Sequence, residues 1–180
     1  MQLRWKMTIK ENDIKNQIRE YLIDEGILRT KIPDSEDKIE FGFRFVFPPG
    51  PKGHHMVVFK PKNKDLIIIN AGTQISPPHV EALNSLGEQK KFKFFMELRK
   101  LFLLRNVFFR IDIKNYRYEV NDQFFLKPDY KISKDKFFST VRKVFNCTAY
   151  SNILLNEFCH PDEAGKFKDF DSESDFTLYS

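Results

Sequence analysis

The feature of the sequence that most constrains the fold is a strict two-residue alternation over residues 39–47. Large apolar residues occupy every second position of this run: Ile39, Phe41, Phe43, Phe45 and Phe47. Because successive side chains of a strand point to opposite faces, these residues share one face. The run ends at a Pro48-Pro49-Gly50-Pro51 segment, where missing N–H donors prevent further sheet pairing. The pattern predicts a strand with one face for a hydrophobic core.

The first helix is predicted from capping and spacing signals. Thr8 and Glu11 match a capping box, and apolar residues recur at helical spacing from Ile14 to Leu22. Gly26 then supplies a left-handed stop. We therefore expect a helix that begins near Thr8 and ends before Gly26.

The remaining elements follow from apolar runs and turn residues. Strands are predicted at residues 27–32, 56–59, 66–69, 107–113 and 116–120, with residues 124–126 extending the last strand after a break. Helices are predicted from Ser76 to about Arg105, with an interruption near Gly87, and from Ser133 to about Cys159. The order α-β(3–4)-α-β-β-α predicts the α+β class, with an antiparallel sheet of about five or six strands and helices packed on one face.

Phenylalanine is unusually frequent, with 20 residues, and four Phe-Phe doublets occur. Phe108-Phe109 and Phe124-Phe125 fall on predicted strands, where the two rings of a doublet point to opposite faces. Either the sheet is covered on both sides at these positions, or one ring of each doublet is exposed.

Length and charge indicate one basic domain with an acidic tail. The 180 residues carry a net charge of +5, and residues 160–180 hold six acids and two lysines, a net of −4. Residues 1–159 therefore carry +9, and we expect them to form a single domain followed by a flexible tail at 160–180. We hypothesise that the tail competes with an acidic ligand for the basic domain, or docks its aromatic residues on a partner.

Cys147 and Cys159 are too few for a disulfide framework and lie twelve residues apart on one predicted helix. They suit a reducing compartment. No secretory signal segment and no uninterrupted apolar run of membrane-spanning length is present, so a cytoplasmic protein is expected.

The element order resembles the type III secretion chaperone-like superfamily over about residues 8–159. The resemblance rests on the order and lengths of the elements, and the basic domain differs from the acidic secretion chaperones. It implies helices on one side of an antiparallel sheet, frequent homodimers, and binding of protein partners without catalysis.

The segment Lys90–Arg105 has the composition of a basic amphipathic helix, which could bind a membrane surface or nucleic acid. Five apolar residues nevertheless share one broad helical face: Phe94, Phe95, Leu98, Leu101 and Phe102. The breadth of this face favours a core helix.

Three sets of residues carry side chains that could form a metal or catalytic site. His54 and His55 are adjacent in a Pro/Gly-rich segment, where extended chain points them apart, which favours a solvated hairpin loop. Cys147, Cys159 and His160 lack metal-ligand spacing. We predict no metal and no cofactor.

The third set is Asp112 and Lys114, whose Asp-x-Lys spacing resembles a metal-dependent nuclease signature. Such a site needs a second acid, for which Asp65 is the candidate, but a chance occurrence on a charged strand is favoured. No catalytic residue is assigned. We predict a non-catalytic, chaperone-like protein-binding module that takes a protein partner or self-associates. The alternatives are nucleic-acid binding through the basic domain and, third, a metal-dependent nuclease.

Overall fold

The computed structural model describes residues 2–33, 38–51, 53–126 and 131–160, with side chains from residue 13 onward. The helices are α1 (Gln2–Asp24), α2 (Pro77–Ser85), α3 (Glu88–Leu104) and α4 (Lys134–Cys159). The strands are β1 (Leu28–Lys31), β2 (Ile39–Phe47), β3 (His54–Pro61), β4 (Leu66–Gln74), β5 (Phe108–Asp112) and β6 (Arg117–Phe125). The predicted tail lies, from residue 161 on, outside the described residues.

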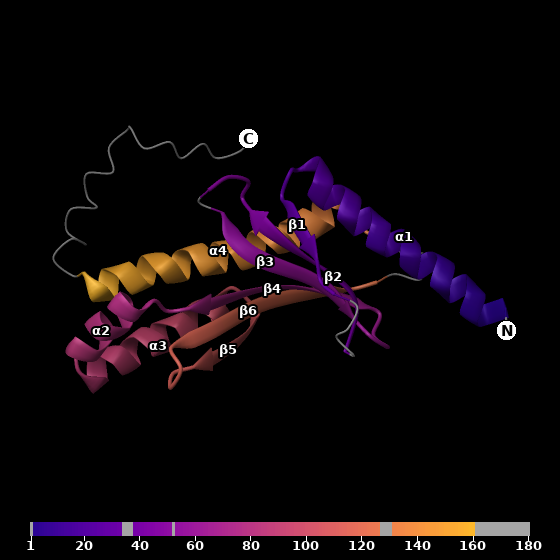
Figure 1. Cartoon of the computed structure of the whole chain (residues 1–180). Helices are drawn as coiled ribbons and strands as arrows, with labels where there is room; N and C mark the ends of the chain where they lie inside the picture. The colour runs from indigo at the N-terminus through magenta and orange to yellow at the C-terminus, as the bar shows by residue number, and fades with distance from the viewer. Residues whose placement is uncertain (1, 34–37, 52, 127–130, 161–180) are drawn as a thin grey trace.

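The six strands form one sheet in the order β1-β2-β3-β4-β6-β5, and every neighbouring pair is antiparallel. Figure 1 shows α4 running along the sheet, with α1 at one end of the molecule and α2 and α3 at the other. The predicted α+β class, strand number and element order are confirmed.

All four helices lie on the same face of the sheet. Ring contacts join α1 to α4 (Tyr21 to Phe137, 5.9 Å), α4 to β2 (Phe145 to Phe47, 5.4 Å) and α3 to β5 through Phe102. Helix α2 packs against α3 and α4. The predicted packing of helices on one face is therefore confirmed.

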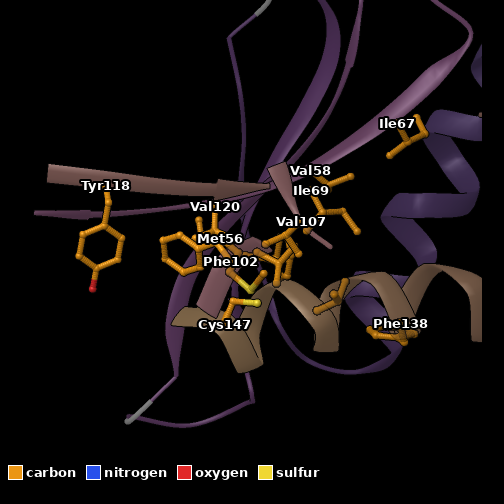
Figure 2. Close-up of a cluster of buried hydrophobic side chains, with 14 of the residues drawn as sticks. Met56, Val58, Ile67, Ile69, Phe102, Val107, Tyr118, Val120, Phe138 and Cys147 are labelled. Atoms are coloured by element: carbon orange, nitrogen blue, oxygen red, sulfur yellow. The ribbon is translucent and has the colours of Figure 1, made fainter. Parts of the chain in front are cut away.

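The core lies between this face and the helices, as Figure 2 shows for the side chains of β3, β4, β6, α3 and α4. The core face predicted for β2 is confirmed, because Phe41, Phe43 and Phe45 are buried, although on the opposite face only Arg44 is exposed and Gly42 and Val46 are buried as well. Tyr118 is 1% exposed, and its hydroxyl lies 2.8 Å from the Ser151 hydroxyl. The core therefore includes hydrogen-bonded polar groups.

Local signals fixed several element ends. Gly26 adopts φ +65°, and the N–H groups of Gly26 and Ile27 donate to Ile23 O and Leu22 O, which ends α1 as predicted. Ser133 accepts a hydrogen bond from the Lys136 N–H at the start of α4. These two predictions are confirmed.

Two predicted boundaries in this set are corrected, and one is confirmed. Helix α1 begins at Gln2 and not near Thr8, since residues 2–7 contain no proline or glycine to stop the helix from extending. Strand β6 runs unbroken to Phe125, because each of its nine residues pairs with β4. Gly87, at φ +81°, divides the long predicted helix into α2 and α3, as the expected interruption indicated.

Candidate functional site

The face of the sheet opposite the helices is covered by no described helix, and we call it the open face. Arg44 of β2, Phe108 and Arg110 of β5 and Arg117 of β6 are exposed on it. The exposed fraction of Phe108 is 54% and that of Phe125 is 75%, whereas Phe124 is 7% exposed. In the doublets of β5 and β6, one ring of each pair is therefore exposed, which is the second of the two alternatives.

The open face becomes concave where β4, β5 and β6 lie side by side. A concavity of about 340 Å³ is lined by Gln74, Arg110, Asp112, Asn115, Arg117, Tyr118 and Glu119. Within it, an Arg117 N–H donates to Glu119 Oε1 at 2.6 Å. Two arginines and two carboxylates are thus brought together by the register of three strands.

Asp112 has a structural role at the end of β5. Its carboxylate accepts hydrogen bonds from the Asn115 backbone N–H (3.1 Å) and from the Asn115 side-chain amide (2.7 Å). These bonds lower the pKa of Asp112. Lys114 lies in the turn that follows. The Asp112 carboxylate therefore holds the β5–β6 turn.

Asp65 and Asp112 are not brought together. Leu66, next to Asp65, pairs with Phe125 at one end of β6, whereas Asp112 pairs with Arg117 at the other end. Nine residues of strand span roughly 30 Å. The pair of acids considered for a nuclease is therefore not assembled.

The paired histidines lie in β3, so the predicted solvated loop at these positions is wrong. The reason is that residues 54–55 pair with Phe47 and Val46 of β2 and extend the ladder. His54 points toward the helices, with its ring centroid 5.3 Å from that of Phe145, and His55 is exposed. Burial, followed by the charge of His55, lowers the pKa of His54. The two side chains diverge, as expected from extended chain.

Both cysteines of α4 are free, and burial raises the pKa of each thiol. The Cys159 thiol approaches His79 O at 3.7 Å, and the His79 ring lies 6.1 Å from that of His160. Across the described part of the chain, no group of three or more His, Cys, Asp or Glu side chains is arranged to hold a metal ion.

The segment 90–105 belongs to α3 as far as Leu104, with Arg105 as the C-cap, and the five residues predicted to face the core are all buried. Other apolar residues of the helix remain exposed: Phe92 at 58%, Leu103 at 63% and Leu104 at 86%. Helical spacing aligns Phe92, Met96 and Leu103, which we call the α3 stripe. No described helix is long and apolar enough to cross a membrane.

Sequence reasoning missed both exposed surfaces. The doublets indicated that one ring could be exposed, but not which ring. The exposure of β5 as an edge strand had no local signal, since strand order is set by distant pairing. The polar alternation of β5 and β6, with arginines at 110 and 117, was the available cue.

The architecture defines a class of protein: an α+β fold with its helices on one face of a six-stranded antiparallel sheet and an arginine-bearing open face on the other. Residues 14–155 match the family model described as "Uncharacterized conserved protein (DUF2299)". The chain therefore belongs to the DUF2299 family. No curated protein sequence matches it.

Two solved structures are similar to the chain. An uncharacterized protein from Methanothermobacter thermautotrophicus is 26% identical, with a TM-score of 0.70, covering 80% of this chain and 97% of that one. YbjN, a putative transcription regulator from E. coli, is 13% identical, with a TM-score of 0.41, covering 81% of this chain and 92% of that one.

Proposed function

We propose that this protein is a non-catalytic protein-binding module that accepts an extended segment of a partner as an added strand along β5. The observation that supports it is the edge position of β5, whose outer side pairs with no described strand. An unpaired edge presents a row of N–H and C=O groups that an extended peptide can complete.

The α3 stripe lies beside this edge. Phe94 faces α4 through Phe158 (5.6 Å between ring centroids), and Phe102 faces the sheet through Phe109 of β5 (5.4 Å). At about 100° per residue, the stripe follows next around the helix, on the side away from α4. An added strand would therefore place alternate side chains against exposed apolar residues of α3.

The positive charge of α3 and β5 indicates which kind of partner segment would bind along this edge. Residues 88–105 hold six cations and two carboxylates, a net charge of +4. Arg110 adds a further cation on β5 itself. A second copy would bring like charges together, whereas a segment that alternates apolar and acidic residues would be attracted. The occupant we infer is such a segment of a partner protein.

The resemblance to the type III secretion chaperone-like superfamily supports this proposal by analogy, because it implies binding of protein partners. The two free cysteines suit a reducing compartment, so we place the module in the cytoplasm.

The test uses three labelled ten-residue peptides with one alternating apolar pattern, whose polar positions are aspartate, serine or lysine. Fluorescence anisotropy should rank their affinities as aspartate above serine above lysine. Leu103→Asp should weaken binding of the aspartate peptide by about tenfold or more, because an apolar contact is lost and a like charge is added. Ile153→Asp, which alters an exposed apolar residue of α4, is the matched control and should leave the affinity unchanged.

Equal binding of all three peptides, or equal loss in both variants, would overturn the proposal. So would sedimentation showing a dimer that Leu103→Asp converts to a monomer, because a second copy would then occupy the edge.

A further inference from the structure

The open face carries an arrangement of side chains that the edge of β5 does not use. Phe108 and Phe125 stand on neighbouring strands with most of their rings exposed. Phe108 pairs with Asn121, four residues before Phe125, so the two rings are roughly 14 Å apart. Exposed aromatic rings on a sheet face are platforms on which unpaired bases stack.

Cations are spread across the same face. Arg44 lies on β2, at one side of the sheet, and Arg110 and Arg117 lie on β5 and β6, at the other. All three are exposed. With four strand spacings of about 4.8 Å between β2 and β5, the arginines bracket a path of roughly 19 Å. A backbone of phosphates that crosses the sheet would meet positive charge at both sides.

The carboxylates on this face are already engaged. Asp112 accepts both hydrogen bonds from Asn115, and Glu119 accepts from Arg117 at 2.6 Å. A guanidinium has five N–H donors, so Arg117 keeps donors for a second acceptor. The domain as a whole, residues 1–159, carries +9. The balance of charge on this face and on the domain therefore favours an anionic ligand.

Amide side chains lie on β4 and β6 of the same face. Asn70 of β4 pairs with Asn121 of β6, and Gln123 lies one step along the same face, beside Ile68. All three amides are partly exposed. Amides both donate and accept hydrogen bonds, as the edges of bases do.

From these observations we propose that the open face binds single-stranded nucleic acid. Bases stack on Phe108 and Phe125, and phosphates contact Arg44, Arg110 and Arg117. The rings must reach unpaired bases, which a duplex would hide, so a single strand is the occupant that fits. This inference does not rest on the proposed function, since its rings and two of its three arginines lie on the open face away from the outer side of β5, and only Arg110 is shared.

The test uses the full chain and two fluorescein-labelled probes, a twelve-residue oligothymidine and a twelve-residue oligouridine, in fluorescence anisotropy from 50 to 300 mM KCl. Three phosphate contacts predict a slope of about −2 for the logarithm of the binding constant against that of the salt concentration. Arg110→Gln should reduce this slope by about 0.7. Arg142→Gln, which alters an exposed arginine of α4, should not change it.

Stacking is tested separately. Phe125→Ala should weaken binding by about 5-fold to 150-fold, the loss expected for one base–aromatic stack, and Phe125→Tyr should restore it. Tyr150→Ala removes an aromatic ring of α4 that is 48% exposed and should leave the affinity unchanged.

Three results would overturn the inference. The first is no binding of either probe at 50 mM KCl, and the second is an equal loss of affinity in the Phe125→Ala and Tyr150→Ala variants. The third is displacement of the probe by polyglutamate at equal charge, combined with an unchanged affinity of the Phe125→Ala variant. The last result would show that any acidic polymer suffices. Far-ultraviolet circular dichroism of each variant shows that its fold is intact.

Discussion

At the scale of single residues, Lys60 of β3 combines charge with deep burial, since it is 2% exposed. Its ammonium donates to Glu40 Oε2, while Glu40 Oε1 is buried and accepts no hydrogen bond from the described residues. Two charges removed from water depend on each other, because desolvation offsets much of their attraction. Removing one partner should therefore cost more than removing both.

We expect Lys60→Met to lower the free energy of unfolding by about 3 kcal/mol, because the Glu40 carboxylate loses its cation in a poorly hydrated position. The double variant Lys60→Met/Glu40→Leu should recover most of this loss. The control is Lys100→Met, which breaks the exposed Lys100–Glu97 pair and should change stability by less than about 1 kcal/mol. Urea denaturation measures all three. A double variant no more stable than Lys60→Met would contradict the argument.

His54 gives a second residue-scale prediction, concerning pH. Its pKa is lowered in the folded protein by burial and by His55, so the unfolded chain binds the proton more tightly. As the pH falls through about 6.5, the unfolded state is protonated first and stability decreases. His54→Phe keeps the ring against Phe145 but cannot be protonated. The wild type should therefore lose more stability than the variant between pH 7.5 and 5.5 in urea denaturation, and equal losses would refute this assignment.

At the scale of elements, the parts of the fold that the sequence predicted well depend on neighbouring residues. The bounds of β2 came from an alternation that proline ends, and the starts of α2 and α4 came from Ser76-Pro77 and Ser133. The errors arose where pairing across the sheet decided the outcome. His54 is in a strand because Phe47 pairs with it, and β6 is unbroken because β4 runs beside it.

The same distinction applies to the candidate surfaces. A Phe-Phe doublet shows locally that two rings diverge, but the choice of exposed ring depends on which face the helices cover. Helical spacing alone aligns the residues of the α3 stripe, yet the position of the stripe beside an edge strand follows only from the order β4-β6-β5. Spacing thus predicted which residues form the core, and topology determined which of the others form surfaces.

At the scale of the whole molecule, packing all the helices on one face separates two surfaces. The helix side supplies the core and the α3 stripe, and the other side carries exposed arginines, partly exposed amides and two strongly exposed rings, beside the partly buried Val57, Phe59 and Ile68. The net charge then acts on both surfaces, because +9 on residues 1–159 is opposed by −4 on residues 160–180. The acidic segment should therefore weaken the binding of any anionic ligand to the domain.

The last prediction tests this opposition. Converting the six acids of residues 160–180 to Asn or Gln raises the net charge from +5 to +11. We expect the oligothymidine probe to bind roughly three- to tenfold more tightly at 50 mM KCl, since carboxylates no longer compete with phosphates for the basic domain. The gain should shrink at 300 mM KCl, where screening shortens the range of charge interactions. The control, Phe167→Ser/Phe170→Ser, keeps the charge and should bind like the wild type. An unchanged affinity in the neutralised variant at 50 mM KCl would show that these acids do not oppose the domain.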